Sequence, residues 1–422
     1  MRAGLAALPA TLAWRANASW SEEFTAVPLP PEAALGDAAH PFWDNLQSEF
    51  AVGDETRHFN TAGLCIPPRS VFESMHTVAL AAAADGDPAR GQLDRARRAV
   101  ARFIGADATE VALMRNATEA MNVVARGIEL RRGDEIVLTT HEHPGGAAPW
   151  VALHQDAGVE LRLVEPRSDP AADAAAVLAA MTKRTRVVVV SHVLSTLGTP
   201  MPVAQLAPEV RSRGAWFVVD GAQAAGIVPV DVRAIGADCY LASGHKWLMG
   251  PPETGFLHVR RERLGELRTR FAGVHTADAV GWDLDHGRLD FLPDASRYEY
   301  GTRSPAQAAG LAAGIEWLEF FGPDTVRQRA LGLGRRFRAG LAGLPGVEVL
   351  TPDWAAAETP IVTFRVTRRP NTQVVDWLWS ELRMRLRPVP DRGLNAVRAS
   401  FHLVNRAPDV DWLIEAVRVL GA

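Results

Sequence analysis

Two residues at the ends of neighbouring apolar runs could do chemistry together. Asp220 ends the run 215–219, and Lys246 stands shortly after the next run, 238–241. An amine in a partly apolar setting has a lowered pKa and can form a Schiff base with an aldehyde. A carboxylate beside a pyridine nitrogen keeps that nitrogen protonated, so the ring can withdraw electrons from the substrate. Although Asp220 alone could be a turn cap and Lys246 a surface lysine, the pair predicts pyridoxal phosphate and an enzyme acting on amino acids.

Neighbouring side chains offer the further donors that this cofactor needs: Thr118, Gln223, Ser243 and His245. Gln223 could donate to the phenolic oxygen, and Ser243 and His245 to the phosphate. Ala117 and Thr118 open an expected helix, whose first N–H groups form an anion site. A plain helix cap and a structural histidine are the alternatives for Thr118 and His245. The presence of Lys246 favours the cofactor.

Two further groups carry chemistry. His141-Glu142-His143 invites a metal site, but it is not an HExxH motif and no other ligand cluster accompanies it. We therefore predict no metal, and expect the His143 imidazole to stack on the pyridine ring. Arg398 lies in an expected strand near 397–401. It could be a surface ion-pair partner or a bidentate clamp on a substrate carboxylate.

The elements that must position these residues alternate along the chain. Strands are expected at 111–114, 135–139, 160–164, 186–190, 215–219, 238–241 and 255–259, with helices at 117–127, 146–157, 172–181 and 202–214. This alternation predicts a mostly parallel sheet covered on both faces. Long helices at 304–320 and 326–344 then lead into strands at 347–350, 361–366 and 397–401 and helices at 373–382 and 410–420. We predict a tail at 1–40, a large domain at 41–324 and a small α+β domain at 325–422.

Composition limits the class of protein. The net charge of −4 gives no electrostatic case for nucleic acid, and no apolar run has the length of a membrane span. The two cysteines, Cys65 and Cys239, suit a reducing compartment, so we expect a cytoplasmic protein. The small-residue segment 3–13 leaves a degenerate export signal as the alternative.

Together these segments resemble the class V aminotransferase group of fold-type I pyridoxal phosphate enzymes, which includes isopenicillin N epimerases and cysteine desulfurases. The resemblance runs over nearly the whole chain. Its most specific segments are VDGAQ at 219–223 and SGHKWLMGP at 243–251, supported by ATEAMN at 117–122, EHP at 142–144 and SHV at 191–193. It implies a seven-stranded, mostly parallel sheet flanked by helices, with a small α+β C-terminal domain.

The resemblance also implies residue roles. Lys246 would carry the cofactor and move protons, with Asp220 on the pyridine nitrogen and His143 stacked on the ring. The phosphate and phenolic oxygen would be held by Ala117, Thr118, Gln223, Ser243 and His245. Gly301 and Thr302 resemble a segment that reaches the partner's phosphate, which implies a homodimer with shared active sites. Arg398 would bind the substrate α-carboxylate.

Some residues depart from the desulfurase pattern. Residues 385–394 contain no cysteine where desulfurases carry the persulfide-forming one, and Ser195 stands where they often place an asparagine near the ring. The segment around Asn60, a candidate substrate contact, looks more like the epimerase branch. We therefore expect an epimerase-like enzyme that removes the Cα proton, with epimerase, C–S lyase or aminotransferase outcomes open. A second base could be Tyr240, Tyr298, Tyr300 or Cys65. A cysteine desulfurase and a non-catalytic binding protein are the rivals.

Overall fold

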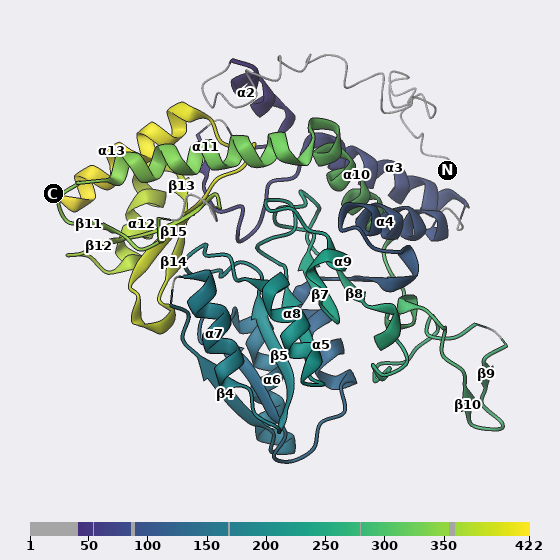
Figure 1. The fold of residues 1–422 in the computed structure, drawn as a ribbon. Helices are drawn as coiled ribbons and strands as arrows, with labels where there is room; N and C mark the ends of the chain where they lie inside the picture. Colours follow the sequence, from purple (N-terminus) through teal and green to yellow (C-terminus); the bar gives the residue numbers. More distant parts are fainter. Residues whose placement is uncertain (1–40, 54, 86–88, 168, 279, 354–358) are drawn as a thin grey trace, which may run out of the picture.

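The computed structural model describes residues 41–422 except 54, 86–88, 168, 279 and 354–358. The predicted tail and its possible export signal lie outside these residues. A seven-stranded sheet forms the centre, in the order β2-β8-β7-β6-β5-β3-β4 (Figure 1). Its strands are β2 (Val111–Met114), β3 (Glu135–Thr139), β4 (Glu160–Val164), β5 (Thr185–Ser191), β6 (Trp216–Asp220), β7 (Cys239–Ser243) and β8 (Gly255–Val259).

Strand β8 alone runs against its neighbours, β2 and β7, and the other pairs of this sheet are parallel. Alternate residues of each strand enter different cores. In β5, Val188 and Val190 belong to one apolar cluster, whereas Val187 and Val189 belong to the other. Both faces are therefore covered, as the continuous apolar runs predicted.

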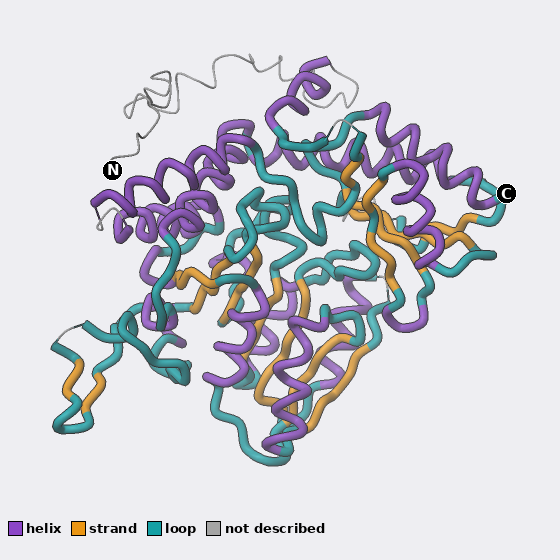
Figure 2. Tube along the Cα trace, turned by 180° about the vertical axis from the view of Figure 1, so that it is seen from behind, coloured by secondary structure: helices purple, strands orange, loops and turns teal. Residues whose placement is uncertain are grey.

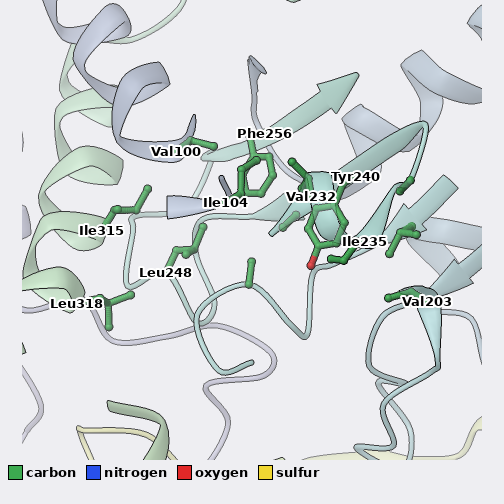
Figure 3. Packing of buried hydrophobic residues seen from close by; sticks show 14 of the residues in the cluster. Val100, Ile104, Val203, Val232, Ile235, Tyr240, Leu248, Phe256, Ile315 and Leu318 are labelled. Atoms are coloured by element: carbon green, nitrogen blue, oxygen red, sulfur yellow. The ribbon is translucent and has the colours of Figure 1, made fainter. Parts of the chain in front are cut away.

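Two sets of helices provide this cover. The helices α5 (Ala117–Gly127) and α6 (Pro144–Ala157) pack on one face. The other face meets α4 (Ala89–Phe103), α7 (Pro170–Ala180), α8 (Val203–Ser212), α9 (Val232–Ile235) and α10 (Pro305–Phe321). Figure 3 shows part of that second core, in which Tyr240 and Phe256 stack with ring centroids 6.4 Å apart. Helix α3 (Arg69–Asp85) lies beside α4 and α10, and α2 (Pro41–Asn45) begins the described chain.

A second, antiparallel sheet belongs to the C-terminal part, in the order β11-β12-β15-β14. Its strands are β11 (Val347–Val349), β12 (Ile361–Val366), β14 (Arg387–Val389) and β15 (Ala396–Ser400), and it packs with α11 (Pro323–Leu341), α12 (Asn371–Leu382) and α13 (Ala407–Gly421). An early segment joins this layer, because β1 (Arg57–His58) pairs with β13 (Met384–Arg385) and Asn60 bridges Ser400. Sequence patterns did not predict this pairing, since its partners are far apart in the chain.

A short hairpin, β9 (Trp282–Asp283) and β10 (Arg288–Leu289), projects from the body in both views (Figures 1 and 2). Several large apolar side chains of this region are exposed, including Val280, Trp282 and Leu284. Among the described helices, none combines the length and apolar character that crossing a bilayer requires. The predicted fold class is confirmed, with a large mixed sheet between helices and a small antiparallel C-terminal sheet.

Candidate active site

The candidate site lies where several strands of the large sheet end at the same edge. Because β6 and β7 are parallel and Asp220 lies opposite Leu241, Asp220 and the turn carrying Lys246 leave the sheet side by side. A cavity of about 290 Å³ opens there. Of the residues predicted from the sequence, it is lined by Ala117, Thr118, His143, Ser195, Asp220, Gln223, Ser243, His245, Lys246 and Arg398.

Lys246 is an unusual residue in this chain. The sequence contains only two lysines, Lys183 and Lys246, although it contains many arginines. Lys183 is exposed, whereas Lys246 is 9% exposed. Burial lowers the pKa of Lys246 to about 8, with Asp220 opposing the change and Arg398 and Arg387 adding to it. An amine with this pKa gives up its proton near neutral pH, which a guanidinium does not do.

Asp220 has a buried carboxyl group with one oxygen that a cationic partner can reach. Burial raises the pKa of its carboxyl, and the Ala222 N–H and the charge of Lys246 oppose this. Its Oδ1 accepts from the Ala222 N–H at 2.9 Å. A Cβ atom on Gly146 would lie 3.0 Å from Oδ2, so this glycine leaves the second oxygen accessible. A protonated ring nitrogen placed there would compensate the buried carboxylate.

The start of helix α5 forms one wall. Asn116 caps it by accepting from the Glu119 N–H at 2.9 Å, and the Ala117 N–H donates to Ser243 Oγ at 3.1 Å. The Ser243 hydroxyl hydrogen thus remains available to a ligand. The Nδ1 atom of His245 is buried and has no hydrogen-bond partner in the part of the chain that the structure describes. This unpaired atom, with the Thr118 hydroxyl and the helix start, fits an anionic group such as phosphate.

His143 caps the start of helix α6, where its Nδ1 accepts from the Gly145 N–H at 3.0 Å. A backbone N–H can only donate, so the neutral ring carries its hydrogen on Nε2. Burial, followed by the charge of Lys246, lowers the pKa of His143 to about 4. His143 is therefore neutral near pH 7. A neutral ring is suited to stacking on an aromatic cofactor.

The neighbours of His143 are engaged elsewhere. His141 contacts Thr196 Oγ1 at 2.7 Å and Glu165 at 3.2 Å. Glu142 accepts from the Thr139 hydroxyl at 2.7 Å and from Ser191, and burial raises its pKa to about 7. No group of three histidine, cysteine, aspartate or glutamate side chains in the described chain is placed to hold a metal ion.

Gln223 lines the cavity, but most of its amide is already used. Its Nε2 donates to Ala62 O at 2.8 Å, and its Oε1 accepts from Trp247 Nε1 at 2.8 Å. One N–H of the amide remains for the predicted bond to a phenolic oxygen. The same contacts tie the segment after Asn60 to the loop that carries Lys246.

Arg398 is 1% exposed and forms no ion pair with the described residues. Its Nη1 donates to Ser195 O at 2.8 Å, its Nη2 lies 3.4 Å from Asn60 Oδ1, and its Nε has no partner. Burial and the charge of Arg387 lower the pKa of Arg398 to about 9, which leaves it charged at neutral pH. A buried guanidinium without an acid favours an anionic ligand. Asn60, a predicted substrate contact, thus reaches the site through Arg398.

Gly301 and Thr302 lie elsewhere. They line a neighbouring cavity of about 380 Å³ together with Arg115, Glu119 and Tyr300. They do not line the Lys246 cavity of their own chain, and their implied contact with a partner's phosphate stays a prediction.

The candidate second bases do not line the Lys246 cavity. The Tyr240 hydroxyl is 3.1 Å from His192 Nδ1, within the core of Figure 3, and the Tyr298 hydroxyl donates to Leu267 O at 2.8 Å. The Cys65 thiol donates to Gly250 O at 3.4 Å, and burial raises its pKa far above the ordinary value. These three groups are committed to structural contacts.

Several lining residues were not predicted as site residues, among them Gly145, Gly146 and Arg387. A Cβ on Gly145 would collide with Thr118 Oγ1, so the glycine pair shapes the cavity floor. The sequence pattern that could have indicated this part of the cavity is the pair of glycines directly after the proline that starts the helix. Arg387 stood in a proline-containing stretch that reads as a loop, and no local signal connected it to Lys246.

Comparisons with known proteins agree with this geometry. The family profile described as Aminotransferase class-V matches residues 76–413. The chain belongs to the class V aminotransferase family. It is 32% identical over 392 residues to an isopenicillin N epimerase of Streptomyces clavuligerus, covering 90% of this chain and 98% of that protein. It is 30% identical over 396 residues to a probable cysteine desulfurase of Pyrococcus abyssi, covering 89% of this chain and 97% of that protein.

Solved structures of cysteine desulfurases also match this fold. The apo structure of a cysteine desulfurase from Thermococcus onnurineus NA1 matches with a TM-score of 0.81 and 28% identity, covering 89% of this chain and 97% of that one. As a class V member, the chain is a pyridoxal phosphate-dependent enzyme. The unpaired His245 Nδ1, the accessible Asp220 Oδ2 and the buried Lys246 fit that cofactor.

Proposed function

We propose that this enzyme removes the α-proton of an amino-acid substrate and returns a proton at the same carbon, as an epimerase does. The observation that carries the proposal is the placement of Lys246. This buried amine, with a pKa of about 8, shares one cavity with the carboxylate of Asp220 and the guanidinium of Arg398. A general base, a carboxylate that can pair with the cofactor and a guanidinium that can bind a substrate carboxylate therefore line the same cavity.

The residues of the cavity would divide the binding of the cofactor. Asp220 would pair with the pyridine nitrogen, His143 would stack on the ring, and Gln223 would donate its remaining N–H to the phenolic oxygen. The phosphate would be held by Ala117, Thr118, Ser243 and His245. When bound, pyridoxal phosphate supplies an electron sink that stabilises negative charge on the substrate Cα.

The chain's own groups then perform the proton transfer. Arg398 holds the α-carboxylate with the N–H groups that Ser195 and Asn60 leave free, which fixes the Cα position. Lys246 Nζ takes the Cα proton, because its lowered pKa leaves a useful fraction of free amine near neutral pH. Neutral His143 lines the cavity and adds no positive charge there.

Exchange of the Cα hydrogen in D₂O tests this function. We expect proton NMR to show loss of the Cα signal for accepted amino acids, and chiral chromatography to show both enantiomers. Lys246→Ala should abolish exchange, whereas Lys183→Arg, which changes the only other lysine, should retain it. Exchange that persists in Lys246→Ala, or products formed without any Cα exchange, would contradict the proposal.

The relatives named as cysteine desulfurases support a second candidate, sulfur removal from cysteine. A persulfide step needs an accessible thiolate. Both cysteines of this chain are buried and outside the Lys246 cavity, and burial raises the pKa of each thiol. These facts favour the epimerase-like reaction. Sulfide release from cysteine, measured with and without an added thiol, distinguishes the two.

We further propose a homodimer in a reducing, cytoplasmic setting, which the two free cysteines suit. Gly301 and Thr302 line a cavity separate from Lys246, and the nearby hairpin exposes Trp282 and Leu284 at 57% and 73%. Apolar exposure of this size favours a protein contact. Sedimentation should give a dimer that Trp282→Lys weakens, and a monomer at micromolar concentration would contradict this proposal.

A further inference from the structure

Two arginines face each other across the C-terminal sheet at the Lys246 cavity. Arg387 on β14 and Arg398 on β15 are direct partners in the antiparallel register, and both line the cavity. Directly opposed residues of a strand pair place their side chains on the same face. Like charges in this arrangement destabilise a sheet, so an anion between the guanidinium groups would relieve a real repulsion.

The protein itself places few negatively charged groups near these two arginines. Arg398 forms no ion pair with the described residues. Arg387 is 3.8 Å from Asp391 Oδ2, and that oxygen has no hydrogen-bond partner among the described residues, so the pair is loose. Among the charged residues that line the cavity are three cations, Lys246, Arg387 and Arg398, and one carboxylate, Asp220; Asp391 adds a second negative charge near Arg387 and Arg398. The cavity therefore has an excess of positive charge.

The cofactor phosphate does not need these arginines. The groups placed to hold it are the helix start at Ala117, the hydroxyls of Thr118 and Ser243, and His245, all of which belong to α5, to β7 or to the turn after β7 and none to the C-terminal sheet. One guanidinium binds the substrate α-carboxylate. The second remains available for another anionic group of the same substrate.

We propose that the substrate is an amino acid with a second carboxylate toward the far end of its side chain, the α-carboxylate on Arg398 and the distal one on Arg387. This inference rests on the proposed function, since it concerns the same cavity. It makes Arg387 the residue that selects acidic side chains. Two guanidinium groups on neighbouring strands also set a limited range for the distance between the two carboxylates.

Binding of simple acids to the cofactor-loaded enzyme tests this selection without turnover. Calorimetry would compare succinate, glutarate, adipate and pimelate with the monocarboxylates of equal length, butyrate, pentanoate, hexanoate and heptanoate. We expect one or two diacid lengths to bind roughly 10- to 100-fold more tightly than the matched monoacid, the range for a charged hydrogen-bonded contact. Arg387→Gln should remove this preference and leave monoacid binding unchanged.

The matched control is Arg385→Gln, which removes the same charge two residues away. Arg385 is exposed, lies outside the cavity and stacks 4.1 Å from the Trp379 ring centroid. It should retain the diacid preference. Equal loss of monoacid and diacid binding in Arg387→Gln would mean that both arginines clamp one carboxylate, and weaker cofactor binding would mean that Arg387 serves the phosphate. Either result overturns the inference.

Amino-acid pairs separate this inference from the function on which it rests. Glutamate and 2-aminoadipate should exchange their Cα hydrogen faster than glutamine and 2-aminoadipate δ-amide, and Arg387→Gln should level each pair. Exchange that is equal within each pair in the unmodified enzyme overturns the acidic-substrate inference while the proposed function stands. Absence of Cα exchange with every amino acid, despite diacid binding, contradicts the function and leaves the anion site.

Discussion

Replacing Arg398 by methionine separates a binding role from a structural one. The guanidinium is 1% exposed and forms no ion pair with the described residues, and burial and the charge of Arg387, opposed by Asp391, lower its pKa from 12.5 to about 9. At 1.36 kcal/mol per pKa unit, a fall of about 3.5 corresponds to roughly 5 kcal/mol of unfavourable free energy for the charged group. Because pH 7 lies below the folded pKa, Arg398 is charged when folded and this penalty is fully present.

Two hydrogen bonds offset that penalty. Arg398 donates to Ser195 O and lies within reach of Asn60 Oδ1, and charged bonds contribute about 1.5–3 kcal/mol each. The opposing contributions nearly cancel, so Arg398→Met should leave the free energy of unfolding within about 2 kcal/mol of the original. Substrate carboxylate binding should instead weaken by roughly 10- to 100-fold.

The assay pairs thermal unfolding with calorimetric binding of a substrate acid. Arg329→Met is the matched control, because Arg329 is also fully buried but donates to Asn405 O at 3.0 Å and packs 5.2 Å from the Trp43 ring centroid. The control should lower the unfolding temperature and preserve binding. If Arg398→Met instead lost several kcal/mol of stability with unchanged binding, Arg398 would be structural and the reasoning wrong.

Three further substitutions follow from the same contacts. Asp220→Asn removes a negative charge that favours the ammonium form, so the pKa of Lys246 should fall below about 8, as measured by the pH dependence of cofactor attachment. Gly146→Ala, whose Cβ would lie 3.0 Å from Asp220 Oδ2, should weaken cofactor binding roughly 10-fold by equilibrium titration, whereas Gly91→Ala in open space should not. Tyr240→Phe should lose about 1 kcal/mol of stability and keep Cα exchange in D₂O; loss of exchange with intact folding would mark Tyr240 as a base.

Local patterns were sufficient for the central sheet. The strands β2, β3, β4 and β8 have the predicted bounds, and β5, β6 and β7 differ by one or two residues, because most strands of a sheet covered on both faces read as apolar runs. The smaller strands were missed for physical reasons. Strand β14 contains Pro388 and is three residues long, and β1 pairs with a strand more than three hundred positions away, so neither has a local signature.

In the candidate site, too, some residues could be predicted from the sequence and others could not. Asp220 and Lys246 were predicted together because parallel strands end at one edge, a rule that needs only sequence order. Arg387 depends on the register between two short strands, and the role of Gly146 depends on the approach of a helix start to Asp220. Such distances arise from packing between distant segments, which composition and spacing do not encode.

Lys246 has the central role proposed for this enzyme, as the residue that carries the cofactor. Borohydride reduction of the cofactor-loaded enzyme fixes that bond, and mass spectrometry of a digest then locates it. With only two lysines in the chain, the assignment is unambiguous. We predict the pyridoxyl mass on the peptide containing Lys246, retained in Lys183→Arg and absent in Lys246→Arg. Labelling of Lys183, or no label on an enzyme that still exchanges the Cα hydrogen, would contradict the central claim.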